Sequence, residues 1–259
     1  MSFEERYHGV TLSILIGCTG FVGGHLARCH QFDLMVHRPN IEEVIGKETE
    51  LLVCAGLPAE KWRANQHPIN DWENTKALAH AVARIEATTA VLISTIDVYQ
   101  DPINVNENDH PDFDGGCLYG THRAWFEAFF RHRFPDSLIV RLPALFAPDL
   151  KKNLVHDFLH DKRDQWIDMN PDSQFQYFDV ALTWSLIERA LLANLKLLNV
   201  CVEPVRAQEI ADLFGVTLSA ESKLIKYDVG SVYSDIFGGA RGYLFDKSHA
   251  LSGIAQLRK

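Results

Sequence analysis

Three glycines near the start of the chain have a spacing that suits the binding of a phosphate group. Gly17-x-x-Gly20-x-x-Gly23 directly follows an apolar, β-branched run at 11–16 and opens a helical pattern. A strand, a glycine turn and a helix in this order bring backbone N–H groups and the positive end of a helix dipole together. Glycine also permits the sharp turn and the close backbone approach that a Cβ atom would obstruct. The pattern predicts a dinucleotide site, and the alternative is an ordinary strand–helix turn with fortuitous glycines.

The end of the next predicted strand bears on which dinucleotide this turn binds. An acidic side chain there takes the ribose 2′-hydroxyl, whereas an arginine or lysine accommodates a 2′-phosphate. This chain has His37 and Arg38 at that place and no acid before Glu42. We therefore expect NADP rather than NAD, and the alternative is a solvent-facing arginine that ends the strand.

Strand and helix patterns alternate along the first part of the chain. Strand patterns stand at 11–16, 33–38, 50–56, 90–95 and 137–142, and helical patterns follow the glycine turn, Asn70 and Gly116. This alternation predicts the α/β class, with a doubly wound parallel sheet of Rossmann type and a small C-terminal substrate lobe. We expect residues 1–148 to form the dinucleotide-binding domain and residues 149–259 to form the smaller lobe packed on the sheet. A polar loop is expected from 100 to 116, and a last strand at 199–202.

The sequence around the turn resembles the extended branch of the short-chain dehydrogenase/reductase superfamily, the NAD(P)-dependent epimerase/dehydratase family. The resemblance rests on the Gly20-Phe-Val-Gly23 core, on Thr95 four residues before Tyr99, and on Tyr119-Gly-Thr-His-Arg123, where the family has Y-G-x-x-K. It covers most of the chain, closely to about residue 148 and loosely beyond it. The segment from Arg38 to Leu51 is unusually short, so we expect one strand–helix element of the family to be absent.

The resemblance implies roles for individual residues. Tyr119 would be the acid/base, Thr95 would donate to the same substrate oxygen, and Arg123 would be the electrostatic partner of the phenol and a ribose contact. Together with the turn and the strand end described above, the implied cofactor contacts are Gly17, Thr19, Gly20, Phe21, Val22, Gly23, His37, Arg38, Ala55, Gly56, Asn74, Ser94, Tyr119, Arg123 and Pro143.

Arg123 departs from the family pattern, which has a lysine at this position. It keeps the charge one helical turn from Tyr119, but its planar fork is bulkier than an ammonium and differently placed. The chain is then either a working variant, or a fold that kept the cofactor and lost the chemistry, or a case in which Tyr119 is merely a surface helix residue. The leading hypothesis is an NAD(P)-dependent oxidoreductase or epimerase/dehydratase-like enzyme that exchanges hydride with a sugar nucleotide or a related hydroxyl or carbonyl substrate. The alternative is a catalytically impaired NAD(P)-binding sensor or scaffold.

Composition narrows the choice of partners and compartment. The chain has 25 Lys and Arg against 34 Asp and Glu, a net charge of −9, and no long basic tract. This argues against nucleic acid and anionic membranes and for a small-molecule substrate. No secretory signal, bilayer-spanning run, C-x-x-C pair or zinc-type histidine spacing is present, so we expect a cytoplasmic protein without a metal. The aromatic stripe of Trp125, Phe126, Phe129 and Phe130 indicates either core packing or the helix–helix seam of a homodimer.

Overall fold

The computed structural model describes residues 12–258 except 112, 114–116, 163–167 and 220–221. They belong to two compact units that are built from alternating stretches of chain. The first unit contains the described residues within Met1–Gln100, His110–Arg141 and Ala181–Leu198, and the second contains those within Asp101–Asp109, Leu142–Val180 and Asn199–Lys259. The sequence suggests one boundary at residue 148, whereas the chain crosses between these two units several times.

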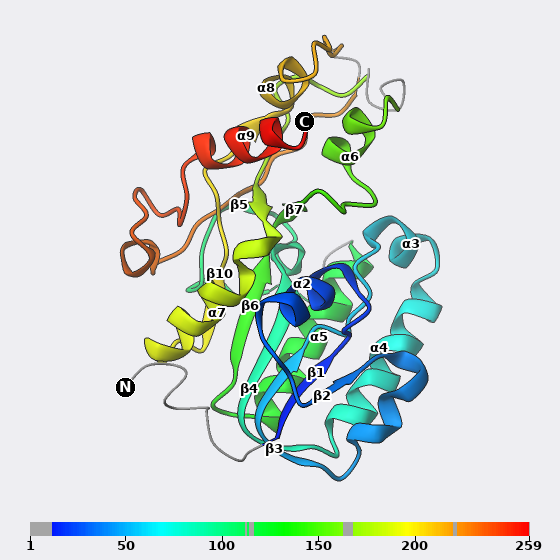
Figure 1. The fold of residues 1–259 in the computed structure, drawn as a ribbon. Helices are drawn as coiled ribbons and strands as arrows, with labels where there is room; N and C mark the ends of the chain where they lie inside the picture. The colour runs from blue at the N-terminus through cyan, green and yellow to red at the C-terminus, as the bar shows by residue number, and fades with distance from the viewer. Residues whose placement is uncertain (1–11, 112, 114–116, 163–167, 220–221, 259) are drawn as a thin grey trace. The chain divides into compact units, whose positions relative to one another are not determined.

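A six-stranded sheet forms the centre of the first unit, in the order β10-β6-β4-β3-β1-β2 (Figure 1). Its strands are β1 (Ser13–Ile16), β2 (Leu34–Val36), β3 (Glu48–Cys54), β4 (Glu86–Thr95), β6 (Leu138–Leu142) and β10 (Leu197–Asn199). The pairs β2–β1, β1–β3 and β3–β4 run parallel. The predicted doubly wound parallel sheet is confirmed. The strand order reverses beside β1, the kind of point at which ligands bind in open α/β sheets.

Helices cover both faces of this sheet (Figure 1). On one face α2 contacts α7, and on the other α4 packs against α5. The helices of this unit are α2 (Phe21–Cys29), α3 (Lys61–Gln66), α4 (Pro68–Val82), α5 (Leu118–Arg133) and α7 (Thr183–Leu192), with the short 3₁₀ helices η1 (Arg38–Val44) and η2 (Ile96–Val98). Between β2 and β3 the chain forms only η1, which agrees with the expected loss of one strand–helix element.

The main hydrophobic core lies between the sheet and α4 and α5. Side chains alternate along a strand, so Ile14 and Ile16 of β1 and Leu92 of β4 face the same cluster. From α5, Phe126 and Phe130 enter this cluster fully buried. Trp125 and Phe129 are partly buried and pack against it. The aromatic stripe therefore serves the core, and a homodimer stays a prediction.

The second unit contains three two-stranded sheets, formed by the pairs β5–β12, β7–β9 and β8–β11. Its strands are β5 (Ile103–Val105), β7 (Ala144–Phe146), β8 (Gln174–Phe175), β9 (Tyr177–Asp179), β11 (Val205–Arg206) and β12 (Asp228–Val229). Its helices are α6 (Leu154–Leu159), α8 (Ala207–Asp212), α9 (Lys247–Gln256) and the 3₁₀ helix η5 (Ser234–Phe237), and the 3₁₀ helix η4 (Val180–Leu182) leads into α7. In the described part of the chain no helix is long and apolar enough to cross a membrane.

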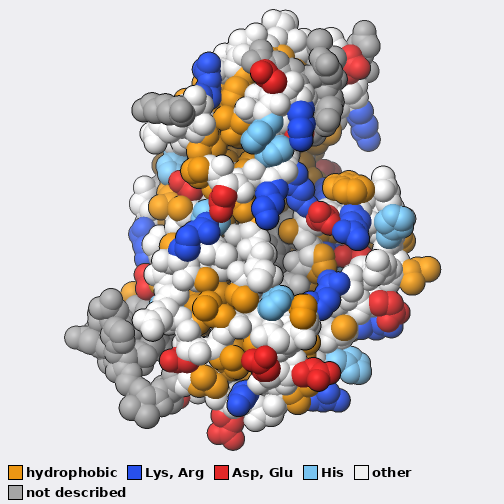
Figure 2. All heavy atoms as spheres, turned by 45° about the vertical axis from the view of Figure 1, so that its right-hand side comes forward, with side chains coloured by type: hydrophobic (Ala, Val, Ile, Leu, Met, Phe, Trp, Pro, Cys, Tyr) orange, Lys and Arg blue, Asp and Glu red, His pale blue; other side chains and the backbone are white. Residues whose placement is uncertain are grey.

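The sequence misplaces several short elements. It gives no helix at α3, it treats the segment that contains β5 as a loop, and it puts a strand at 199–202, where the structure has β10 at Leu197–Asn199. These elements have three to six residues, too few for a hydrophobic period to be read. Figure 2 shows acidic and basic side chains interspersed over the face it draws, so the negative net charge is not gathered there.

Two adjacent glycines of α2 allow a matched test of how closely this helix packs against the glycine turn before it. A Cβ atom on Gly23 would lie 2.1 Å from the carbonyl oxygen of Gly17, whereas on Gly24 the nearest atom, a Cys18 oxygen, would be 3.7 Å away. We expect Gly23→Ala to lower the free energy of unfolding by about 2 kcal/mol or more, because helix and turn must separate. Gly24→Ala should leave it unchanged or raise it by about 0.5–1 kcal/mol. Urea unfolding followed by circular dichroism measures both, and equal stabilities would contradict the expectation.

Candidate active site

The glycine turn lies where the strand order reverses. The amide of Gly17, at a φ of +91°, donates to the carbonyl oxygen of Val36 at 2.7 Å. The amide of Ala55 donates to the carbonyl oxygen of Ile16 at 2.8 Å. A Cβ atom on Gly17 would lie 2.4 Å from the Ala55 oxygen. The backbones that leave β1, β2 and β3 therefore converge so closely that residue 17 has to be a glycine.

The first turn of α2 is suited to an anion. Its N-cap residue, Gly20, makes no side-chain cap, and no acidic residue stands in the first turn of this nine-residue helix. The helix dipole places partial positive charge and backbone N–H groups at this end. Thr19 and Gly20 are exposed, and Phe21 and Val22 are partly exposed. The turn therefore fits the pyrophosphate of a dinucleotide.

His37 and Arg38 follow β2, as expected. The amide of His37 donates to the side-chain oxygen of Asn40 at 2.8 Å, which fixes the start of η1. Arg38 is exposed, and its guanidinium pairs with no other residue that the structure describes. The charge of Arg38 is thus unpaired among the described residues, at the place where a 2′-phosphate is expected.

Gly56 follows the end of β3. A Cβ atom on Gly56 would lie 3.1 Å from the Ile16 side chain.

Thr95 at the end of β4 and Tyr119 in the first turn of α5 come together. The Thr95 hydroxyl stands close enough to the Tyr119 phenol to act on its pKa by hydrogen bonding, and Thr95 Oγ1 accepts from the amide of Asp97 at 3.2 Å. Tyr119 is 6% exposed, so the hypothesis of a surface tyrosine is wrong. Burial raises the pKa of the phenol to about 12, and the positive charge of Arg123 acts against this rise. The two residues that the resemblance makes catalytic therefore lie together, with Tyr119 buried and Thr95 partly exposed.

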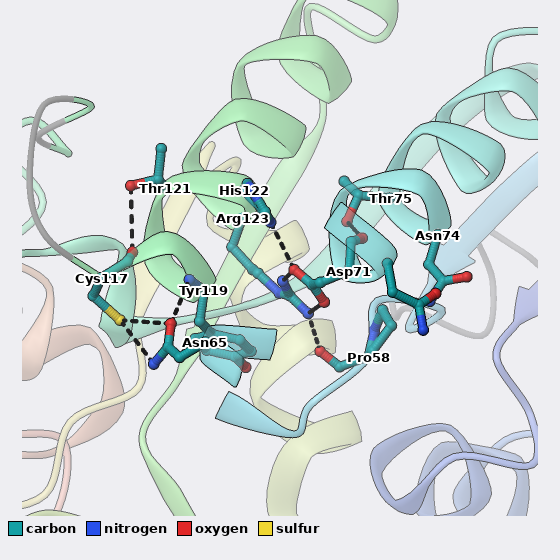
Figure 3. Close-up of polar contacts among 11 residues, drawn as sticks. Pro58, Asn65, Asp71, Asn74, Thr75, Cys117, Tyr119, Thr121, His122 and Arg123 are labelled. Carbon is teal, nitrogen blue, oxygen red and sulfur yellow. Dashed lines mark hydrogen bonds and ion pairs between the residues drawn. The ribbon is translucent and has the colours of Figure 1, made fainter. Parts of the chain in front are cut away.

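Arg123 is buried and directs its fork at Asp71 of α4 (Figure 3). Its Nη2 donates to Asp71 Oδ1 at 2.9 Å, and Nη1 donates to Oδ2 of the same carboxylate. Nη2 also donates to the carbonyl oxygen of Pro58. The guanidinium carbon lies 4.1 Å from the ring centre of Tyr119. Arg123 thus acts on the phenol through its charge, while its terminal nitrogens are engaged by the protein.

One nitrogen of Arg123 makes no hydrogen bond within the described part of the chain. Its Nε is buried and has no hydrogen-bond partner among the described residues. A buried donor without an acceptor is costly, so a ligand oxygen that reached it would be favourable. The ribose contact implied by the resemblance therefore stays a prediction, restricted to this one atom.

Asp71 is a member of the site that the sequence does not reveal. Besides Arg123 it contacts His122, whose Nδ1 lies 2.7 Å from Asp71 Oδ2 (Figure 3). Burial alone would raise the pKa of Asp71, but hydrogen bonds from Arg123 and His122 outweigh it and lower the pKa overall. Nothing local distinguishes Asp71 from the other acids of the chain. Only the packing of α4 against α5 selects it.

The short helix α3 contributes two more residues that the sequence analysis misses. Asn65 Oδ1 accepts from the amide of Tyr119 at 3.1 Å and satisfies a donor in the first turn of α5. Lys61 Nζ lies 2.6 Å from Asp97 Oδ1. Both residues stand in a segment for which no helix is predicted, so no face could be assigned to them.

Other predicted cofactor residues have different surroundings. The side-chain amide of Asn74 donates to Asn70 Oδ1 at 3.3 Å, on the outer part of α4 (Figure 3). The hydroxyl of Ser94 donates to Glu127 at 2.6 Å, and Glu127 is in turn bound by the buried Arg141. Pro143 follows β6 and belongs to the second unit. Ser94 is thus engaged in the core, and the cofactor roles of these residues stay predictions.

The similarity of this chain to known proteins is seen in its structure. No protein-family model matches the sequence, and no curated protein does. Among solved structures, the dTDP-4-dehydrorhamnose reductase of Yersinia enterocolitica aligns over 96% of this chain and 100% of its own, with a TM-score of 0.72 and 14% identity. The Bacillus anthracis reductase solved with NADP aligns over 95% and 97%, with 0.72 and 15%. UDP-glucose 4-epimerase of Thermotoga maritima, solved with UDP-glucose, aligns over 95% and 98%, with 0.68 and 11%. The chain shares their fold.

Loss of the Asp71 carboxylate should expose its role. We expect Asp71→Asn to lower the free energy of unfolding by about 3–5 kcal/mol, because Arg123 would be left as an uncompensated buried charge. Since the folded pKa of Asp71 lies below its unfolded value, its contribution is present above the unfolded pKa and fades as the pH falls through the folded one. Chemical unfolding between neutral and acidic pH should therefore show a smaller acid-dependent loss in Asp71→Asn than in the parent.

The exposed pair Asp136–Lys196, at 2.7 Å, supplies the control. Asp136→Asn should change stability little, because surface ion pairs contribute little. If Asp71→Asn and Asp136→Asn were equally mild, the buried fork would not hold the site together.

Proposed function

We propose that this chain is an NAD(P)-dependent oxidoreductase or epimerase that exchanges hydride with a sugar nucleotide or a related hydroxyl or carbonyl compound. The observation that carries the proposal is the pairing of Thr95 with the buried Tyr119 under the charge of Arg123. The glycine turn of the same unit, with its anion-suited helix start, supports it. The fold neighbours support it as well, because they include sugar-nucleotide reductases and epimerases.

In this proposal Tyr119 handles the proton. Its phenol gives a proton to the carbonyl oxygen of the substrate during reduction and takes one from the hydroxyl during oxidation. Thr95 hydrogen-bonds the same oxygen and orients it. Arg123, with its guanidinium carbon 4.1 Å from the ring centre, stabilises the phenolate that proton donation leaves behind. The positive charge therefore serves the acid/base function although the residue is not a lysine.

The cofactor is held by residues of the same unit. When bound, NAD(P) supplies or accepts the hydride. The turn at 17–23 and the start of α2 would hold the pyrophosphate, and His37 and Arg38 would hold a 2′-phosphate, which favours NADP. The buried Nε of Arg123 would donate to a ribose hydroxyl. We also propose that the substrate is a small molecule and that the protein acts in the cytoplasm.

Arg38 should set the preference for NADP. We expect Arg38→Ala to weaken NADPH binding by about tenfold or more, the loss of one charge-assisted contact, and to leave NADH binding nearly unchanged. Titration of cofactor fluorescence at fixed ionic strength measures both constants. Arg84→Ala removes another exposed arginine and should change neither. A parent protein that binds NADH as tightly as NADPH would contradict the preference.

Tyr119→Phe tests the proton role. Because it removes only the hydroxyl, we expect turnover of UDP- and dTDP-linked sugars with NAD(P)(H) to fall by about 10²–10⁴-fold while cofactor binding is kept. Tyr233→Phe makes the same deletion in the second unit and should leave turnover unchanged. Cofactor binding without turnover of any such sugar by the parent protein would contradict an enzymatic function. Unimpaired turnover in Tyr119→Phe would refute the role of this phenol.

A further inference from the structure

An ion pair from two short helices stands beside Thr95 and Tyr119. Lys61 is the first residue of α3, and Asp97 lies in η2, directly after β4. Lys61 Nζ and Asp97 Oδ1 are 2.6 Å apart, and the side chains are 42% and 19% exposed. The pair is thus neither buried in the core nor freely mobile in solvent.

Asp97 connects this pair to the proposed chemistry. Its amide donates to Thr95 Oγ1 at 3.2 Å, and its Oδ2 lies 3.5 Å from the same hydroxyl. Thr95 in turn stands beside the Tyr119 phenol and lowers its pKa by hydrogen bonding. Lys61, Asp97, Thr95 and the phenol therefore lie next to one another in this order. They belong to the four elements α3, η2, β4 and α5.

We propose that Lys61 and Asp97 are positioning residues of the Thr95–Tyr119 pair, in which Asp97 fixes the threonine hydroxyl and Lys61 compensates the carboxylate next to it. This inference rests on the proposed function for its meaning in catalysis. The placement of the two charges is testable without it.

The charged groups around Tyr119 explain why the compensation of the Asp97 carboxylate by Lys61 matters. Arg123 reaches it from α5, Asp97 from η2 and Lys61 from α3, beside Thr95 of β4. Arg123 and Lys61 favour the phenolate, whereas Asp97 disfavours it and so works against Arg123. Asp71 of α4 already pairs with Arg123, so without Lys61 the Asp97 carboxylate would further weaken the effect of Arg123 on the phenol. Lys61 thus offsets the carboxylate that holds Thr95.

An ordinary surface ion pair is the competing interpretation. Such pairs contribute little to stability and exert no directed effect on a neighbouring group. Stability measurements alone would not separate the two, so the test reads the ionisation of Tyr119 itself. Fluorotyrosine placed at position 119 reports this ionisation by ¹⁹F NMR, and fluorination brings the transition to lower pH.

The three charge variants have opposite expected signs. In the full chain without cofactor, Lys61→Met should raise the pKa of the labelled phenol by about one pH unit, and Asp97→Asn should lower it by a similar amount. The double variant, which removes both charges, should return it close to the parent value. Lys76→Met is the matched control, because Lys76 is 40% exposed and pairs with Glu73 at 2.8 Å, and it should cause no shift.

The outcome is independent of whether the chain is an enzyme, because neither cofactor nor substrate is present. Shifts of opposite sign that cancel in the double variant support the positioning role. Absent shifts, or shifts of one sign in both single variants, would overturn it. Circular dichroism confirms that each variant is folded. For turnover with NADPH, in which the phenol has to be protonated, the alkaline limb of the pH profile should move in the same direction as the pKa of the phenol in each variant.

Discussion

The buried fork between Arg123 and Asp71 is the interaction on which the candidate site depends. It joins α5 to α4 across 52 positions of sequence and fixes the guanidinium above the Tyr119 ring. A single ammonium would make neither the two-pronged contact nor the stacking. The arginine therefore fits because a carboxylate stands opposite, and the pair has to be considered as one unit.

The Arg123–Asp71 pair determines how the positive charge of Arg123 acts on the Tyr119 phenol. The terminal nitrogens of Arg123 are held by Asp71 and Pro58, so its influence on Tyr119 is electrostatic and comes from the ring face. Burial opposes ionisation and raises the phenol's pKa to about 12. A second cation, Lys61, enters from α3 and meets a carboxylate that holds Thr95. The balance of these charges, and no single residue, sets the readiness of the phenol to give up a proton.

The nucleotide part of the site depends on backbone geometry instead. At Gly17 and Gly23 the chain passes so close to Ala55 and to itself that a side chain would collide. The same closeness sets the start of α2 at the point where the strand order reverses. The connections of the parallel sheet therefore by themselves create backbone geometry that suits an anion, and Arg38 adds a positive charge at the neighbouring strand end.

The sequence by itself determined the features that are local or periodic. Alternating strands and helices predicted the sheet, the glycine spacing predicted the turn, and one helical turn placed Arg123 beside Tyr119. Tertiary structure decided which distant groups those residues meet. Asp71 as the partner of Arg123, Lys61 as the partner of Asp97, and Glu127 as the acceptor for Ser94 all lie 33 to 52 positions from their partners. No hydrophobic period marks such pairs, because a single polar contact between elements depends on how whole helices pack and leaves no pattern along the chain.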